Sequence, residues 1–291
     1  MDSQVSSGFV QRFQAPRPVK VIAVCSGKGG VGKTNVAANI AIALSAEGHN
    51  VALLDADLSL ANIDVLLGLQ PRFNLSHVLN GEIDVADTLL DGPRGVRIIP
   101  ASSGNFDMSK LDSRGQATLI NAFSQMSDQP DVLVVDTAAG IAPSVARFVK
   151  AAQYPVVVLR DEPASLTDAY ALIKVFSRNY GMRRFHIVTN QSQGRQAGRR
   201  LFAKLDRVAD SYLDVVLRHT GDIPQDDYVV KAVQQQCAVT DAYPNSPAGR
   251  AFRTLARSLA ELPSATKAHG GLQFFMESLV MADATYKGKV A

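Results

Sequence analysis

Cysteine, tryptophan and long apolar runs are scarce in this 291-residue chain, which has two cysteines, no tryptophan and no C-x-x-C spacing. Isolated thiols exclude a four-cysteine metal or iron–sulfur site within one chain, and no disulfide framework is expected. The N-terminal segment lacks the apolar core of a secretory signal, and no apolar run approaches the roughly 20 residues that span a bilayer. These absences predict a protein of a reducing, cytoplasmic compartment.

Composition leaves the class of partner open. Hydrophobic residues make up 46% of the chain and charged residues 20%, which is typical of a globular protein with a sizeable core. The formal net charge of +3 neither requires nor excludes nucleic acid, because a nucleic-acid surface depends on how charges cluster and not on their total.

Apolar strand-like runs alternate with helix-like segments from residue 19 onward. The expected strands are Val19–Ser26, Val51–Asp55, Val96–Pro100, Asp131–Asp136, Pro155–Leu159 and Phe185–Asn190. The expected helices are Lys33–Glu47, Gln116–Ser127, Ser144–Ala152, Ser165–Tyr180, Gly198–Ser211, Asp226–Gln236, Ala248–Leu262 and Leu272–Ala282. This order predicts an α/β fold, a mostly parallel twisted sheet with helices on both faces. We expect a flexible arm at 1–18, one domain at 19–262, and a linker with a last amphipathic helix at 263–291.

A phosphate-binding loop is predicted between the first strand and the first helix. The segment GKGGVGKT, Gly27–Thr34, matches G-x-x-x-x-G-K-[ST] in the strand-to-helix context that gives this pattern its meaning. Glycines let backbone N–H groups point inward, and the helix N-terminus adds positive charge. Lys33 would neutralise the β- and γ-phosphates of ATP, and the Thr34 hydroxyl would ligate Mg²⁺. The predicted phosphate-contacting residues are Gly27, Gly29, Gly30, Val31, Gly32, Lys33, Thr34 and Asn35.

Acidic residues stand where two predicted strands end. Asp55 and Asp57 leave one strand and Asp136 ends another, so parallel pairing would bring these carboxylates towards the phosphates. Asp136 suits a Mg²⁺-holding role, directly or through water, and Asp57 suits the orientation of an attacking water, with Mg²⁺ ligation as its second predicted role. The simpler alternative for either residue is that it caps a helix or turn.

The loop K-G-G-V-G-K-T, with an extra lysine at Lys28, resembles the deviant Walker A motif of the ParA/MinD (SIMIBI) family of P-loop ATPases. DADLSLANID resembles that family's switch I and DTAAGI its switch II. VTNQ and GDIPQDDYVVKAVQQQCAV resemble its adenine-side elements, so that the likeness covers Val19–Val239. DEPASLTDAYALIK and GGLQFFMESLV narrow the resemblance to the flagellar-number regulator branch, FleN/FlhG.

This resemblance implies a homodimer that forms with ATP and hydrolyses it slowly. In the family, the residue corresponding to Lys28 reaches across the dimer to phosphates bound by the partner. Glu162 and Asp168 match positions of interface carboxylates that interact with the nucleotide or this lysine. The resemblance also implies that Asn190 reads the adenine edge and that the loop from Asp222 to Pro224 packs around the base.

Two residues depart from the family pattern. Ser59 stands where switch I usually has glycine, which alters loop freedom because glycine samples positive φ freely. Arg160 stands at a strand end where the family tends toward small or uncharged residues, and either pairs with Asp161, enters the dimer contact or is simply exposed. Both departures bear on the rate of ATP hydrolysis and on the affinity of the dimer. Neither removes a predicted catalytic group.

Two functions follow from the resemblance. The first is a regulatory ATPase that binds and inhibits an enhancer-type flagellar transcription activator, thereby controlling flagellar number and placement. The alternative is a membrane- or nucleoid-partitioning ATPase of the MinD/ParA kind that positions cargo. The expected location is cytoplasmic, with a polar or peripherally membrane-associated position as the alternative.

Two surface features leave alternatives open. Arg200, Lys204 and Arg207 recur at i, i+4 and i+7 of a predicted helix, a row that favours solvent or a docked protein over nucleic acid. The last helix has an apolar stripe and only Glu277 as a charge, so packing on its own domain or a partner is favoured over transient membrane contact.

Overall fold

The computed structural model describes residues 19–57, 62–100, 129–263 and 272–281, together with Thr118, Ile120 and Phe123. The arm at 1–18, Ser59 and most of the helix expected at 116–127 lie outside these residues.

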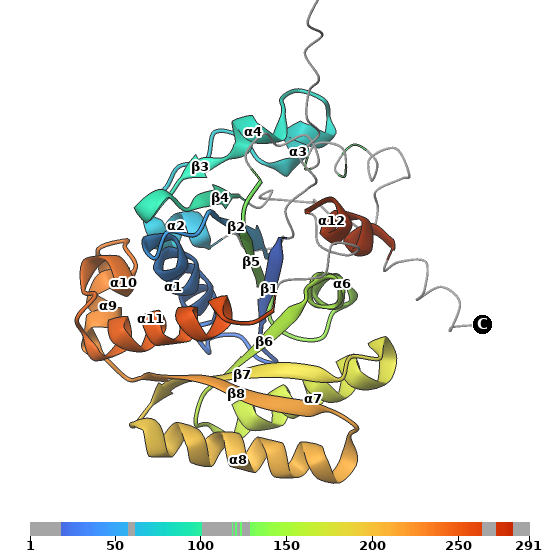
Figure 1. The fold of residues 1–291 in the computed structure, drawn as a ribbon, viewed down its shortest axis with the longest axis vertical. Coiled ribbons are helices and arrows are strands. Elements are labelled where there is room, and N and C mark those ends of the chain that lie inside the picture. Colours follow the sequence, from blue (N-terminus) through green and yellow to red (C-terminus); the bar gives the residue numbers. More distant parts are fainter. Residues whose placement is uncertain are drawn as a thin grey trace, which may run out of the picture.

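One twisted sheet of eight strands runs through the described part of the chain (Figure 1). Its order is β3-β4-β2-β5-β1-β6-β7-β8, and every pair is parallel except β3 with β4. The strands are β1 (Lys20–Cys25), β2 (Val51–Ala56), β3 (Leu90–Asp91), β4 (Arg97–Ile99), β5 (Val132–Thr137), β6 (Tyr154–Leu159), β7 (Arg184–Ser192) and β8 (Val216–Pro224). The predicted α/β class is confirmed, but the sequence analysis missed β3 and β8.

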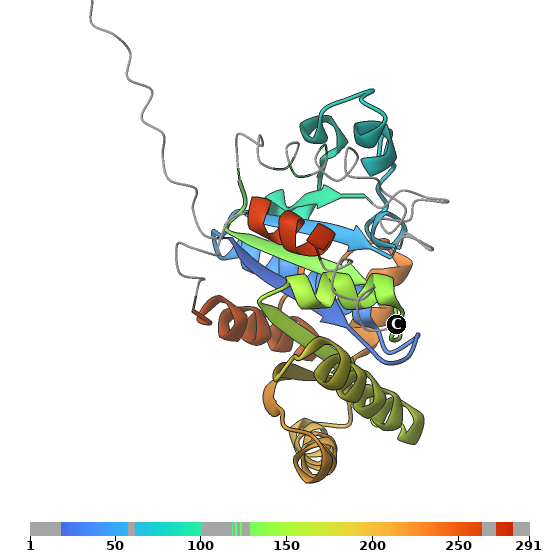
Figure 2. The same cartoon turned by 90° about the vertical axis from the view of Figure 1, so that its right-hand side faces the viewer.

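Helices cover both faces of this sheet, as Figures 1 and 2 show. Residues of α1, α10 and α11 pack on one face, and residues of α6, α7, α8 and α12 pack on the other. The helices are α1 (Lys33–Ala46), α2 (Ile63–Leu67), α3 (Leu75–Leu79), α4 (Val85–Thr88), the 3₁₀ turn η1 (Pro93–Gly95), α6 (Pro143–Ala151), α7 (Pro163–Tyr180), α8 (Arg195–Tyr212), α9 (Asp227–Gln234), α10 (Val239–Ala242), α11 (Pro247–Ala260) and α12 (Leu272–Met281).

The central strand β1 shows why its sequence is a continuous apolar run. Its side chains alternate between the two cores, with Val21 and Ala23 on one side and Ile22 and Val24 on the other. A strand covered by helices on both faces needs apolar residues at every position. The parallel register also places Val24 beside Asp136 and Asp55 beside Asp136, so the carboxyl ends of β1, β2 and β5 meet at one edge.

The last helix packs on the domain. Phe275, Met276 and Leu279 of α12 are buried in the same core as Val145 and Phe148 of α6. Of the alternatives left open by the sequence, packing on the domain is therefore the arrangement in this structure. No helix in the described ranges is long and apolar enough to cross a membrane.

Candidate functional site

The loop between β1 and α1 depends on glycine at particular positions. Gly30 and Gly32 adopt φ values of +79° and +87°, in the left-handed region that side chains disfavour. At Gly27 a Cβ would lie 2.2 Å from the backbone oxygen of Asp168, so α7 approaches the loop too closely for any larger residue. The backbone N–H of Gly140 donates to the Ser26 carbonyl at 2.8 Å, which ties the segment after β5 to the loop.

Lys33 and Asp136 form a buried ion pair at the start of α1. Lys33 Nζ donates to Asp136 Oδ1 at 2.7 Å, and the two side chains are 8% and 0% exposed. Burial raises the pKa of Asp136, and the Lys33 charge opposes that rise. The second carboxylate oxygen, Oδ2, is buried and has no hydrogen-bond partner of good geometry among the described residues, although the nearby Thr34 hydroxyl lowers the pKa of Asp136. A buried carboxylate oxygen without a hydrogen-bond partner is energetically unfavourable, and a bound ligand would remove this penalty.

The residues around this oxygen fit Mg²⁺. Thr34 and Asp57 line the adjacent cavity, so a hydroxyl and a carboxylate lie at the same end of the sheet as Asp136. Mg²⁺ prefers oxygen ligands and is commonly held by one or two carboxylates together with substrate phosphates. The structure thus brings together the three residues that the sequence analysis assigned to the metal.

Asp55 organises the connection after β2, a role that the sequence analysis did not assign. Its buried carboxylate accepts the backbone N–H groups of Asp57 at 3.1 Å, Asn62 at 3.0 Å and Ile63 at 3.2 Å. Burial and the nearby charge of Asp136 raise the pKa of Asp55 to about 6, although these three N–H donors act in the opposite direction. One side chain therefore fixes both Asp57 and the start of α2.

Lys28 lies at the surface of the loop, in contrast to Lys33. Its Nζ is 3.6 Å from Glu162 Oε2, and Arg160 Nη2 is 3.3 Å from Glu162 Oε1. The Lys28 and Glu162 side chains are 44% and 39% exposed. Of the alternatives left open for Arg160, the structure shows an ion pair with Glu162, the N-cap residue of α7, in place of the one expected with Asp161.

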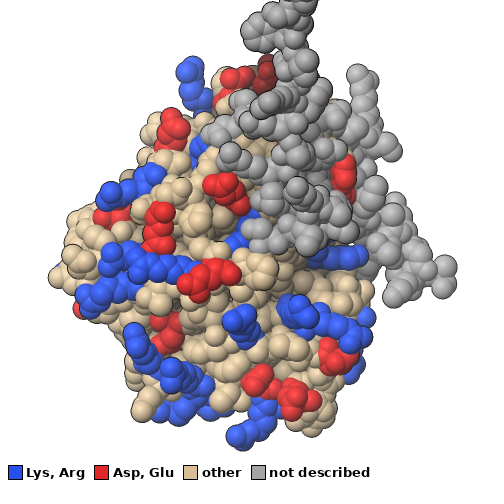
Figure 3. All heavy atoms as spheres, in the orientation of Figure 1, with Lys and Arg blue, Asp and Glu red and all other residues tan. Residues whose placement is uncertain are grey.

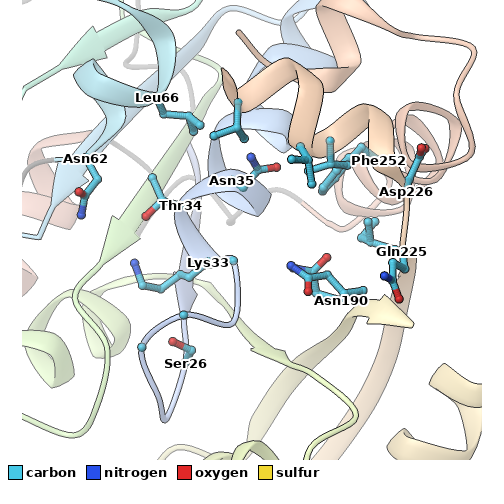
Figure 4. Close-up of a pocket in the computed structure, with 18 of the residues that line it drawn as sticks. Ser26, Lys33, Thr34, Asn35, Asn62, Leu66, Asn190, Gln225, Asp226 and Phe252 are labelled. Carbon is cyan, nitrogen blue, oxygen red and sulfur yellow. The ribbon is translucent and has the colours of Figure 1, made fainter. Parts of the chain in front are cut away.

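A cavity of about 860 Å³ extends from the loop to α9. Figure 4 shows Lys33 and Thr34 at one side of it and Asn190, Gln225 and Phe252 at the other. Ser26, Lys28, Gly29, Gly30, Gly32 and Asn35 also line the loop side. The opposite side presents mainly apolar surface, from Val65 and Leu66 of α2, Ile223 and Pro224 of β8, Val229, Val230 and Val233 of α9, and Phe252 of α11. Polar residues among them are Gln191, Gln225, Asp226, Asp227, Gln234 and Gln236. Its size and its mixed lining suit a nucleotide with phosphates at the loop and a base at α9.

Asn190 lines this cavity, but its amide supports the loop. Asn190 Nδ2 donates to the Val31 carbonyl at 2.8 Å, and a Cβ on Gly32 would lie 2.5 Å from the same nitrogen. The next residue, Gln191, also lines the cavity and has φ +54°, unusual for a residue with a side chain. Whether Asn190 also reads the base stays a prediction.

The structure does not bring Asp222 to the cavity, which corrects the placement expected from the sequence. Asp222 Oδ1 accepts the Thr189 hydroxyl at 2.7 Å, and it is the atom that a Cβ on Gly198 of α8 would meet. The expected loop from Asp222 to Pro224 is in fact the end of β8. Since successive strand side chains point to opposite faces, Ile223 lines the cavity and Asp222 faces α8.

The sequence analysis also missed α2 and Phe252 as parts of the cavity wall. Gln236, with φ +52°, donates from Nε2 to the Val65 carbonyl at 3.2 Å and so joins the end of α9 to α2. Neither a motif nor a periodicity marks Val65 and Phe252, because they come together with α9 only through the packing of distant segments.

The sequence of this chain was compared with models of known protein families. The family model described as "ParA: NUBPL iron-transfer P-loop NTPase" matches residues 18–260. Iron transfer is part of the description of that family model. In this chain the two cysteines are free and lie on different elements, Cys25 buried in β1 and Cys237 after α9.

Two curated relatives and one solved structure are similar over most of the chain. "Antiactivator FleN" of Pseudomonas aeruginosa is 54% identical over 276 residues, which cover 95% of this chain and 99% of the relative. "Flagellum site-determining protein YlxH" of Helicobacter pylori is 33% identical and is matched over 78% of this chain and 76% of its own length. The MinC:MinD cell division protein complex of Aquifex aeolicus contains a chain with 26% identity and a TM-score of 0.66, matched over 85% of this chain and 98% of that one.

Proposed function

Because the chain belongs to the ParA family of P-loop NTPases, we propose that it is an ATP-controlled dimerising switch that inhibits a flagellar transcription activator. The proposal that this protein binds a nucleotide is supported by the buried Lys33–Asp136 pair. Within the described part of the chain, this pair leaves one carboxylate oxygen without a hydrogen-bond partner of good geometry, near a cavity of nucleotide size. Members of this family are ATPases, and slow, Mg²⁺-dependent hydrolysis is the reaction proposed for this site.

The protein's own residues position and neutralise charge. Lys33 and the backbone N–H groups of the glycine loop bind the phosphates, and the N-terminus of α1 adds its positive end. Asp57, held by Asp55, orients the attacking water. When bound through Thr34, Asp57 and Asp136, Mg²⁺ supplies charge neutralisation at the phosphate oxygens. Positioning and electrostatic stabilisation account for most catalysis in phosphoryl transfer.

Lys28 is the residue through which ATP would control dimerisation. Its exposed pair with Glu162 is of a kind worth only about 0–1 kcal/mol, so Lys28 can leave Glu162 for the phosphates of a second subunit at little cost. Arg160 stays with Glu162 when this happens, and the carboxylate is then not left unpaired.

The inhibitory role rests on similarity to the Pseudomonas aeruginosa antiactivator over almost the whole of both chains. Under this proposal the ATP-bound homodimer binds an enhancer-type flagellar activator in the cytoplasm, or at the cell pole, and limits its activity. Hydrolysis returns the protein to a monomer and releases the activator, because a ligand shifts an assembly equilibrium only through different affinities for its two states.

Light scattering with ADP and with a non-hydrolysable ATP analogue tests the switch. We expect a dimer with the analogue, a monomer with ADP, and an ATP-trapped dimer for Asp57→Ala. Lys28→Gln should bind nucleotide but stay monomeric, whereas Lys33→Gln should not bind. If Lys28→Gln loses binding to the same extent as Lys33→Gln, the assignment across the dimer is wrong.

The activator itself tests the inhibitory role. ATP-loaded protein should suppress the activator's ATPase without lipid or DNA. Stimulated turnover that requires liposomes or DNA and ignores the activator would instead support a partitioning ATPase.

A further inference from the structure

We propose that the exposed face of α8, with the start of β8, is the surface on which this protein binds its activator, and that the complementary surface of the activator is acidic with an apolar centre. The identity of the partner rests on the proposed function. The location and chemistry of the surface rest on α8 itself.

A row of three unpaired cations lies along α8. Arg200, Lys204 and Arg207 are exposed, and none has an ion-pair partner within the described ranges. The spacing of i, i+4 and i+7 places them on one side of the helix over about 10 Å. Figure 3 shows basic side chains along the lower edge of the molecule, where α8 lies, with acidic side chains next to them towards the right.

The two carboxylates on α8, half-buried Asp206 and exposed Asp210, do not lie in this row. At 100° per residue, Asp206 and Asp210 lie on the side of the helix that carries Arg195 and Arg199. Together those four residues make a mixed surface with little net charge. The cations at 200, 204 and 207 are therefore a separate positive strip, available to a partner's carboxylates.

Apolar side chains adjoin this strip. Val208, Tyr212 and Val216 are 40%, 70% and 63% exposed, and they lie within nine residues of one another. Val208 lies next to Lys204 on the helix. Tyr212, one turn further on, is turned towards the side of Leu201 and Leu205 and is exposed as the last residue of α8, and Val216 begins β8. Single exposed apolar residues are ordinary, but a group next to unpaired arginines has the composition of a protein interface, where tyrosine and arginine are enriched.

This mixture favours a protein over a nucleic acid as the partner. A phosphate backbone offers charge to Arg200 and Lys204 but nothing apolar to Val208 or Tyr212. An acidic protein surface with an apolar centre satisfies both. Its carboxylates would accelerate encounter with the strip, while burial of Tyr212 would slow dissociation.

The surface stands on a rigid support. Leu201, Leu205 and Ala209 bury the opposite side of α8 in the core. Phe202 stacks on His219 of β8, with ring centroids 5.0 Å apart and an interplanar angle of 20°. A docking surface that is already fixed loses little entropy on binding.

Binding kinetics of the full-length protein with ATP, Mg²⁺ and the purified activator test the inference. Reversing the strip by Arg200→Glu, Lys204→Glu and Arg207→Glu should lower affinity at least ~10-fold, mainly through slower association, and should flatten the dependence on salt. A matched control reverses three exposed cations on other elements, Arg72→Glu, Lys150→Glu and Arg178→Glu, and changes the net charge equally. This control should stay within about twofold of the unmodified chain.

A second variant tests the apolar part without changing charge. Tyr212→Ala should leave association unchanged and raise the dissociation rate by about 10-fold. Each variant should keep its ATPase activity and melting temperature, because every changed side chain is exposed and lies outside the cavity.

The outcomes separate the two proposals. If the unmodified chain does not bind the activator, the proposed function and this inference both fail. If the strip variant and the control bind equally well, the inference alone fails. If the unmodified chain instead binds random duplex DNA through the strip and Tyr212→Ala has no effect, the surface is one for nucleic acid and the inference is overturned.

Discussion

At the phosphate end of the cavity, one continuous segment from Gly27 to Asn35 supplies the loop, the helix N-terminus and the lysine. From elsewhere, Asp57 and Ala139 line this end, and the buried Asp136 pairs with Lys33. At the base end, α2, the ends of β7 and β8, α9 and α11 each contribute one or a few side chains. The phosphate end is polar and holds a buried ion pair. The base end is mostly apolar and includes residues that are half exposed.

This difference shows how each end gains its specificity. Charge and backbone N–H groups bind phosphates strongly, so a short segment with the right geometry suffices. An apolar base pocket gains affinity from area, and area must be gathered from several elements. Changes at the phosphate end should therefore have large local effects, and changes at the base end small and selective ones.

The largest expected effect is that of Lys33→Gln on the free energy of unfolding. Loss of the cation leaves Asp136 as an uncompensated buried charge, which costs roughly 3–5 kcal/mol. Chemical denaturation measures this cost, and pyrophosphate binding should be lost as well. Lys28→Gln is the matched control, since its exposed pair should change stability by less than about 1 kcal/mol. Equal destabilisation by the two variants would contradict the contrast between a buried and an exposed lysine.

Asn190→Ala tests the contact that joins the two ends. Removal of the amide leaves the Val31 carbonyl without its donor, at a cost of about 1–3 kcal/mol. Because this hydrogen bond supports the loop, the affinities for ATP and for GTP, measured by calorimetry, should fall by the same factor. Gln191→Ala, at the exposed neighbouring position, should have a smaller effect on both. A loss confined to ATP would show that Asn190 reads the adenine, as the sequence predicts.

Asp222→Ala should affect stability but not the nucleotide. The variant loses the 2.7 Å hydrogen bond with Thr189, which is worth about 1 kcal/mol, while adenosine affinity stays the same. Thr189→Val should have a similar effect, and the double variant should cost less than the sum of the two. Weaker adenosine binding in Asp222→Ala would restore the base-contacting role expected from the sequence.

The smallest expected effect is that of Val230→Ser at the mouth of the base end. Val230 is 57% exposed, so the free energy of unfolding should change by less than ~0.5 kcal/mol. Adenosine should bind about threefold more weakly, because a base would lose apolar contact area, and pyrophosphate should bind as before. Weaker pyrophosphate binding would mean that the two ends are not independent.

Strand β8 was missed because the apolar patterns that predict central strands are weak in a strand at the edge of a sheet. The central strands are apolar runs because helices cover both of their faces, and these were predicted to within a residue or two. Strand β8 lies at the sheet edge, where exposed and half-buried positions alternate and Arg218 and His219 interrupt any apolar run. An edge strand has fewer buried neighbours, so its sequence is less constrained.

The directions in which the Asn190 and Asp222 side chains point also could not be predicted from the sequence pattern. The pairing of β7 with β8 shifts register between Ile187 and Val188 and again between Thr189 and Ser192. A shift of register changes which face each side chain points to, and it has no signature in a single sequence. The segments around Asn190 and after Gly221 do lie at the base end, but α2, α11 and several of the side chains that reach the cavity were not foreseen.

Sequence alone was sufficient for the class of fold and for the phosphate loop, since alternating apolar runs and a contiguous glycine–lysine segment have their geometry built into neighbouring residues. Tertiary structure was needed for the pairing of both Lys28 and Arg160 with Glu162, the role of Asp55, the wall of the base end and the packing of α12 on α6. The Lys28–Glu162 pair, the wall of the base end and the α12 packing join residues that are distant along the chain, and only the packing of the sheet and its helices brings such residues into contact. Asp55 and Arg160 contact near neighbours, but no sequence pattern marks which neighbour each one contacts.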